Sequence, residues 1–184
     1  WTKNQLNLMT NVRTAGGVAL GTQTDDTYDD SYAILQGNWG ADYEIEGVVF
    51  RDPALPNSAN PSHEIELLCR ASDGVAAYQS YEIMFTSSGV VQGFRWNAPI
   101  DWSLLPDVGP GYGSEILDGD VLKARIVGNI ITYFVNGTAT ATADISSISP
   151  QYNAGNPGIA FFTRPAVGGN TSRFGLKNVR VTKL

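Results

Sequence analysis

Hydrophobic and polar residues alternate along much of this chain, in short segments separated by Gly, Asn, Asp and Pro. Alternation with a period of two places successive side chains on opposite faces of a β-strand, whereas an amphipathic helix repeats its apolar residues every three to four positions. The segments predicted as strands are Tyr43–Phe50, His63–Arg70, Tyr78–Thr86, Val90–Asn97, Val121–Val127, Ile130–Val135, Thr138–Ala143, Gly158–Thr163 and Arg173–Lys183. A short helix or helical turn is expected near Ile145–Ile148. The pattern therefore predicts an all-β protein, a multistranded sandwich or barrel.

Two dipeptides mark tight turns between consecutive predicted strands. Gly128-Asn129 separates Val121–Val127 from Ile130–Val135, and Asn136-Gly137 separates that strand from Thr138–Ala143. Both dipeptides tolerate the positive φ that two-residue hairpin turns need, so these strands should form an antiparallel meander. Because no internal repeat or change of composition divides the sequence, we expect a single domain over residues 1–184.

The composition of the 184 residues excludes several classes of protein. Twelve Lys and Arg face 18 Asp and Glu, giving a formal net charge of −6, and 42% of the residues are hydrophobic. That hydrophobic fraction is sufficient for a core, which excludes general disorder. An acidic chain without a Lys/Arg cluster is a poor partner for phosphate backbones, and no run approaches the roughly 18 apolar residues of a membrane helix. We therefore expect neither nucleic-acid binding nor membrane insertion.

The lone Cys69 and the lone His63 limit the possible chemistry. They cannot supply the ligands of a Cys/His structural zinc site within one chain. A separation of six residues along one strand, at about 3.3 Å per residue, places them roughly 20 Å apart, too far for a Cys–His nucleophile pair. Cys69 is interpreted as a core residue, and His63 receives no catalytic role.

Several segments follow one another in an order that resembles a known superfamily. They are Tyr81–Phe85, Gly93–Pro99, Gly119–Asn129, Phe134–Gly137 and Gly155–Phe162. From about Asp42 to the C-terminus, the chain resembles the concanavalin A-like lectin/glucanase superfamily, in particular its laminin-G-like and 3-keto-disaccharide-hydrolase-like jelly rolls. The resemblance implies a two-sheet antiparallel jelly-roll sandwich with one curved sheet, whose concave face often holds polysaccharide.

Alternation also predicts a charged sheet face. In His63–Arg70, for example, Glu64 and Glu66 lie opposite Ile65 and Leu67. If four successive strands are neighbours in one sheet, one face carries the side chains of Glu44, Glu64, Glu66, Arg70, Glu82 and Arg95. These groups would hydrogen-bond the hydroxyls of a bound sugar. The alternative is a solvated face with cross-strand Glu–Arg pairs.

Glu64 and Glu66 are the candidate catalytic residues if the protein is an enzyme. Retaining glycosidases need two carboxyl groups about 5–5.5 Å apart, and neighbouring strand positions can supply such a pair. Glu64-Ile65-Glu66 resembles the Glu-x-Asp-x-x-Glu strand of sandwich glucanases, but the middle acid is Glu66 and Cys69 stands where the third acid should fall. We therefore expect no catalytic residues in the leading hypothesis.

Aromatic residues in predicted loops are candidates for stacking against the apolar faces of sugar rings. Trp39, Trp102 and Tyr112 occupy such positions, whereas Trp96 alternates with Phe94 toward the expected core. The three loop aromatics are predicted to stand at the rim of the polar face.

A cluster of acidic residues lies in the segment Thr24–Asp30, formed by Asp25, Asp26, Asp29 and Asp30. Hard cations such as Ca²⁺ bind six to eight oxygen ligands, and closely spaced Asp residues can provide several of them. Structural calcium is frequent in jelly rolls of the superfamily that the chain resembles. We therefore expect a structural Ca²⁺ site, with a charged loop that binds nothing as the alternative.

The leading functional hypothesis is a non-catalytic, polysaccharide-binding module of an extracellular or surface-exposed protein. A glycoside hydrolase or polysaccharide lyase using carboxylates on the same face is one alternative. A self-assembling surface-layer, fibre or virion decoration protein is the other, and it requires a large apolar patch or open sheet edges. Because the sequence opens Trp1-Thr2-Lys3, without Met or an apolar leader, we expect a chain processed or excised from a longer polypeptide.

Overall fold

The computed structural model describes residues 2–3, 10–23, 30–55, 63–74, 77–98, 101–109, 111–163 and 173–184. The strands are β1 (Thr2–Lys3), β2 (Thr10–Ala15), β3 (Val18–Gly21), β4 (Ser31–Ile34), β5 (Tyr43–Arg51), β6 (His63–Gly74), β7 (Ala77–Thr86), β8 (Val91–Ala98), β9 (Asp101–Leu104), β10 (Asp107–Val108), β11 (Val121–Val127), β12 (Ile130–Val135), β13 (Thr138–Asp144), β14 (Asn156–Thr163) and β15 (Phe174–Lys183). Every strand expected from the alternation is present. The short strands β1 to β4, β9 and β10 were not predicted.

At Ile145–Ile148, where a short helix or a helical turn is expected, the structure has a hydrogen-bonded turn and no helix. The Ile148 N–H donates to the Ile145 carbonyl at 3.2 Å, and the Asp144 carboxylate accepts from the Ser146 N–H at 2.9 Å. Asp and Ser side chains compete with helical backbone bonds in this way and favour turns. The part of the chain that the structure describes contains no helix long and apolar enough to cross a membrane.

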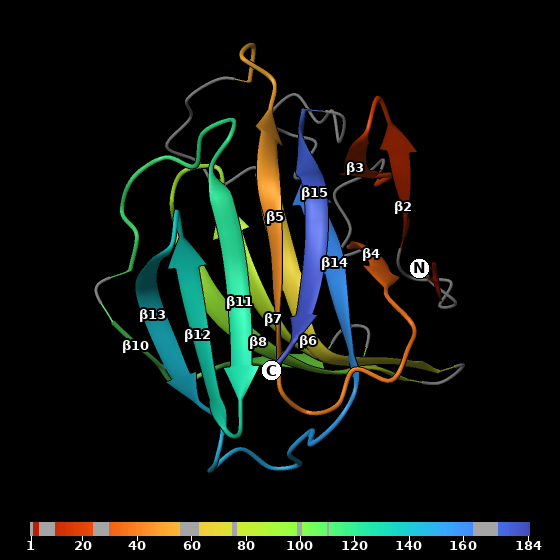
Figure 1. Ribbon diagram of the computed structural model, residues 1–184, viewed down its shortest axis with the longest axis vertical. Helices are drawn as coiled ribbons and strands as arrows, with labels where there is room; N and C mark the ends of the chain where they lie inside the picture. The colour runs from red at the N-terminus through yellow and green to blue at the C-terminus, as the bar shows by residue number, and fades with distance from the viewer. Residues whose placement is uncertain are drawn as a thin grey trace.

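The strands form two layers that face each other (Figure 1). Sheet A has the order β1-β4-β14-β6-β7-β8-β9, and sheet B has the order β10-β13-β12-β11-β5-β15-β3-β2. β2 also pairs with β4, in parallel, and so links the two sheets at one edge. The meander β11-β12-β13 is confirmed, with positive φ at Gly128 (54°), Asn136 (51°) and Gly137 (78°).

The main core lies between the two sheets. Tyr43 and Ile45 of β5 pack there with Ile65 and Leu67 of β6, and all four side chains are fully buried. Cys69 belongs to the same core, as predicted, and burial raises the pKa of its thiol to about 12. An uncharged, inaccessible thiol is a packing residue rather than a nucleophile.

A second, smaller core lies on the face of sheet A that points away from sheet B, here called the outer face. It consists of Tyr32, Ile34, Leu68, Ala71, Tyr78, Trp96 and Ala160, with Phe94 packed against it. The alternation in β6 explains this placement, because Leu68 shares its face with Glu64 and Glu66 rather than with Ile65 and Leu67. The outer face of sheet A therefore holds buried apolar residues beside its carboxylates.

Candidate functional site

A hollow of about 330 Å³ lies on the outer face of sheet A, and we call it the acidic groove. It is lined by Asp30, Glu64, Glu66, Glu82, Met84, Thr86, Val90, Gln92, Phe94, Trp96, Trp102 and Phe162. The residues from β6, β7 and β8 come from adjacent strands, and pairing brings them to one face because side chains repeat every second position. The structure thus brings together the predicted site residues Glu64, Glu66, Glu82 and Trp102.

Three carboxyl groups of the groove converge, and we call Asp30, Glu66 and Glu82 the acid cluster. Each offers an oxygen atom, and these oxygen atoms all lie within 4.8 Å of one another. The exposed fractions of the three residues are only 7%, 1% and 4%. The Trp96 indole N–H donates to the Glu82 carboxylate at 2.5 Å, so this tryptophan orients one member of the cluster.

The electrostatics of the acid cluster follow from its burial. Burial raises the pKa of the Glu66 carboxyl well above its usual range, and the negative charges of Glu82, Asp30 and Glu64 raise it further. Burial also raises the pKa of Glu82, followed by the charges of Asp30 and Glu64, while the hydrogen bond from Trp96 opposes them. Withdrawal from water disfavours a charged carboxylate, and like charges nearby add to the effect. The groove therefore favours ligands that donate hydrogen bonds or bring positive charge.

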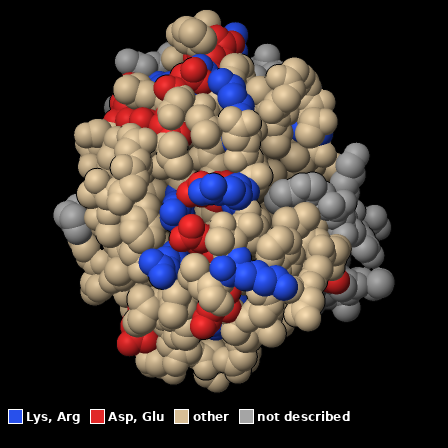
Figure 2. All heavy atoms as spheres, in the orientation of Figure 1, with Lys and Arg blue, Asp and Glu red and all other residues tan. Residues whose placement is uncertain are grey.

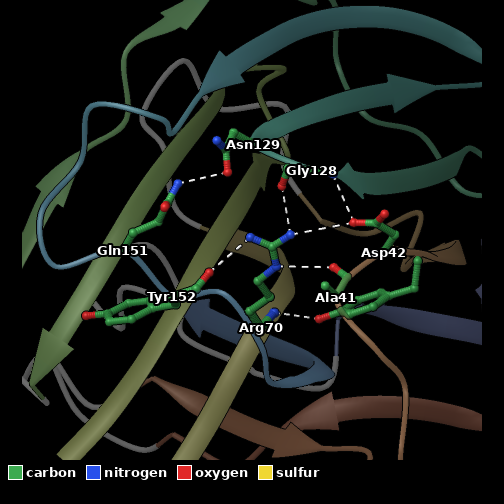
Figure 3. Close-up of polar contacts among 8 residues, drawn as sticks. Ala41, Asp42, Arg70, Gly128, Asn129, Gln151 and Tyr152 are labelled. Carbon is green, nitrogen blue, oxygen red and sulfur yellow. Dashed lines mark hydrogen bonds and ion pairs between the residues drawn. The ribbon is translucent and has the colours of Figure 1, made fainter.

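Arg70, predicted on this face, lies elsewhere. It has a φ of +49° within the irregular pairing between Cys69 and Ser72, which interrupts the alternation of β6. Its guanidinium donates to the carbonyl oxygens of Ala41 (3.1 Å), Tyr152 (3.0 Å) and Gly128 (2.7 Å) and lies 3.7 Å from the Asp42 carboxylate (Figure 3). Arg70 thus ties sheet A to the β11–β12 turn of sheet B.

Arg95 also faces away from the groove. The pairing of β7 with β8 places Arg95 opposite Tyr81, on the inner face of sheet A, and its guanidinium lies 5.2 Å from the centre of the Tyr152 ring. The same register turns Phe94 and Trp96 toward Glu82 on the outer face. Trp96 is buried, as predicted, but within the smaller core beside the groove rather than between the sheets.

Glu44 belongs to the other sheet. β5 lies between β11 and β15 in sheet B, so Glu44 points to the outer face of that sheet, where Lys123 lies 3.3 Å from it. Lys, Arg, Asp and Glu side chains gather over the middle of this face (Figure 2). The prediction that Glu44 shares a face with Glu64 and Glu66 is therefore wrong, because β5 and β6 follow each other in sequence but belong to different layers.

Of the predicted aromatic platforms, only Trp102 lines the acidic groove, and 45% of its surface is exposed. Trp39 packs against the main core, and its indole N–H donates to the Leu35 carbonyl at 2.9 Å. Tyr112 also packs partly buried against that core. Phe94 contacts Trp102 edge to face, with ring centres 5.3 Å apart, and extends the apolar wall of the groove.

The predicted calcium ligands Asp25, Asp26 and Asp29 lie outside the described residues. Asp30 is described, and it belongs to the acid cluster rather than to an exposed loop. His63 is buried, and burial lowers the pKa of its imidazole to about 4, with the charges of Arg51 and Arg173 adding to the effect.

The alternation within β8 did not reveal that Phe94, Trp96 and Gln92 line the groove. The signal that fixes their face is the turn between β7 and β8. The Thr86 N–H donates to the Val90 carbonyl at 2.9 Å, and counting back from this pair places Phe94 opposite Glu82. The short Ser87–Gly89 connection therefore fixes the register between β7 and β8, as tight hairpin turns do.

No protein-family model matches the chain, and no curated protein matches it in sequence. Among solved structures, the carbohydrate-binding module CBM66 from Bacillus subtilis has a TM-score of 0.66 and 13% identity, over 98% of this chain and 99% of that chain. Bacillus licheniformis β-glucanase has a TM-score of 0.56 and 14% identity, over 100% and 92% of the two chains. Alginate lyase A1-II′, a member of polysaccharide lyase family 7, has a TM-score of 0.54 and 12% identity, over 94% and 84%. These similarities confirm the concanavalin A-like jelly-roll fold.

Proposed function

We propose that this protein is a non-catalytic carbohydrate-binding module that holds a stretch of polysaccharide in the acidic groove. The observation that carries the proposal is the exposed indole of Trp102 beside buried carboxylates in one hollow. Aromatic side chains stack against the C–H faces of sugar rings, and a few placed polar groups fix the orientation of the ligand. Glu64 and Gln92 line the same hollow and supply such groups.

The proteins that share the fold support the same class of ligand. Their names describe a carbohydrate-binding module, a glucanase and an alginate lyase. A polymeric glycan partner in turn favours an extracellular or surface-exposed location, as does the weakly charged surface, with only 16% of residues Asp, Glu, Lys or Arg.

Trp102→Ala tests this proposal by removing the platform from the rim of the groove. Affinity electrophoresis against neutral, uronic-acid and amino-sugar polysaccharides identifies the polymer that retards the wild-type protein. For that polymer, we expect Trp102→Ala to weaken binding about tenfold or more, as expected for an aromatic residue at the centre of an interface.

Phe50→Ala is the matched control, because Phe50 lies on the outer face of sheet B, 5.0 Å from Lys177, and not in the groove. It should leave the affinity unchanged. Equal losses in the two variants, or no retardation of the wild-type protein by any polymer, would contradict the proposal.

Glycoside hydrolysis is the second candidate function, and it is favoured by the environment of Glu66. A buried carboxyl with a raised pKa is suited to donate a proton to a leaving group, and Glu64 lies next to it on the same face. Incubation with the bound polysaccharide, followed by measurement of new reducing ends, separates the two functions. An enzyme releases product and loses that activity in Glu66→Gln while retaining affinity, whereas a binding module releases none.

A further inference from the structure

The three carboxyl groups of the acid cluster are both buried and close together, unlike the carboxylates of a solvated charged surface. Asp30, Glu66 and Glu82 are all more than nine-tenths buried, and one oxygen atom from each lies within 4.8 Å of the other two. Asp30 comes just before β4, while Glu66 and Glu82 belong to the paired strands β6 and β7. Ligands from three separate segments, two of them on a sheet, form a rigid site.

The spacing of these oxygen atoms matches the coordination sphere of calcium. Ca²⁺ binds oxygen at about 2.3–2.6 Å, so two oxygens on one ion lie at most about 4.6–5.2 Å apart. The oxygen atoms of the acid cluster lie within 4.8 Å of one another, which falls inside this range. Mg²⁺, with bonds of about 2.0–2.1 Å, requires distances below about 4.2 Å and a near-regular octahedron.

A second observation points to a missing ligand at the same place. The Oε2 atom of Glu66 is inaccessible to water and accepts no hydrogen bond from any residue that the structure describes. Buried carboxylate oxygens ordinarily have donors, and such an orphan atom indicates an unseen partner. The side chain is 1% exposed and its carboxyl group is a member of the acid cluster, so we place the partner beside these three carboxyl groups.

We propose that Asp30, Glu66 and Glu82 bind a divalent cation, preferentially Ca²⁺, at the floor of the acidic groove. A cation satisfies three convergent acceptors at once, whereas a single hydroxyl proton serves only one of them. Trp96 supports the site without contacting the ion, because its indole N–H holds the Glu82 carboxylate in place. The remaining coordination positions face the hollow, where water supplies the other oxygen ligands. The proposal does not depend on whether a glycan occupies the groove.

Calcium titration of the chelator-treated protein tests the proposal without any sugar. Ca²⁺ at millimolar concentration should raise the Tm by about 3 °C or more, because a ligand that binds only the folded state stabilises it. Tb³⁺ should give luminescence sensitised by Trp96, which contacts a proposed ligand, and Ca²⁺ should displace it. Mg²⁺ should have a smaller effect on the Tm.

Two variants and one control locate the ion. Glu66→Gln and Glu82→Gln should each abolish both the Tm shift and the Tb³⁺ signal, and circular dichroism verifies that they are folded. Glu46→Gln should retain both responses, because Glu46 lies on the outer face of sheet B, paired with Lys123 and Arg180. Absence of a calcium response in the wild-type protein would overturn the proposal. A response retained in folded Glu66→Gln would overturn it too, and would place the ion elsewhere.

Discussion

The outer faces of the two sheets both carry carboxylates, but their surroundings shift the pKa of these groups in opposite directions. On sheet B, Glu46 lies 3.1 Å from Lys123 and 2.6 Å from Arg180. On sheet A, Glu66 and Glu82 are buried and form no ion pair with any residue in the described ranges. Burial opposes ionisation of Glu46, but the hydrogen bonds and charges of Lys123 and Arg180 together lower its pKa. In Glu66 and Glu82, burial and neighbouring carboxylates raise the pKa.

Strand register accounts for this difference. In sheet B, both Lys123 of β11 and Arg180 of β15 lie directly opposite Glu46 of β5. In sheet A, the residues opposite Glu66 are Met84 of β7 and Ala160 of β14, neither of which carries a charge. Directly opposite residues are the pairs that stabilise or destabilise a sheet. The carboxylate Glu46 on sheet B therefore has charged residues directly opposite it, whereas Glu66 on sheet A has none.

The largest expected effect comes from Arg70, the cation that is predicted on the groove face and that the structure places against the β11–β12 turn. Arg70→Met should lower the free energy of unfolding by about 3–5 kcal/mol, because it leaves three carbonyl oxygens without their donor and removes the partner of Asp42. Urea denaturation measures this change. If Arg70 instead served the groove, the variant would lose glycan affinity at little cost in stability.

Arg125→Met provides the matched control for that experiment. Arg125 is exposed on the outer face of sheet B, opposite Glu44, and its removal should change the unfolding free energy by less than about 0.5 kcal/mol. Similar losses in the two arginine variants would show that Arg70 does not tie the sheets together.

The sequence predicts the faces within a strand well, because alternation is a local property of the backbone. Glu64 and Glu66 share a face in the structure, as expected, and Ile65 and Leu67 lie in the core on the other side. The failure at Arg70 has a local cause that the alternation does not contain. A single residue with positive φ within irregular pairing shifts the period, and Arg is an uncommon residue in that conformation.

Relations between strands are harder to predict, because they depend on pairings between distant segments. Glu44 precedes Glu64 along the chain, but β5 pairs with β11 and β15 while β6 pairs with β14 and β7. Nothing in the alternation of β5 identifies its sheet. Arg95 was misplaced for a related reason. Alternation shows that Arg95 lies on the opposite face from Phe94 and Trp96, but only the register of the β7–β8 hairpin shows which of these two faces is the inner one.

A change of smaller size tests whether the carboxylates of sheet A destabilise the protein. In the presence of a chelator at neutral pH, Glu66→Gln or Glu82→Gln should raise the free energy of unfolding by about 1–2 kcal/mol. The amide removes a buried like charge and can donate a hydrogen bond within the acid cluster. Binding sites commonly carry such a cost in stability. Loss of stability in both variants would show that these carboxylates have stabilising partners.

On sheet B, Glu46→Gln should change the free energy of unfolding in the opposite direction and by the smallest amount. The substitution removes the ion pairs with Lys123 and Arg180, and it should lower the free energy of unfolding by less than about 1 kcal/mol. Because these groups are partly exposed, 1 M NaCl should screen most of the difference between variant and wild type. The two glutamate substitutions are chemically identical, so opposite signs in the same denaturation experiment can only reflect their surroundings. If Glu46→Gln and Glu66→Gln instead changed stability in the same direction, the register of charged partners would not distinguish the two faces.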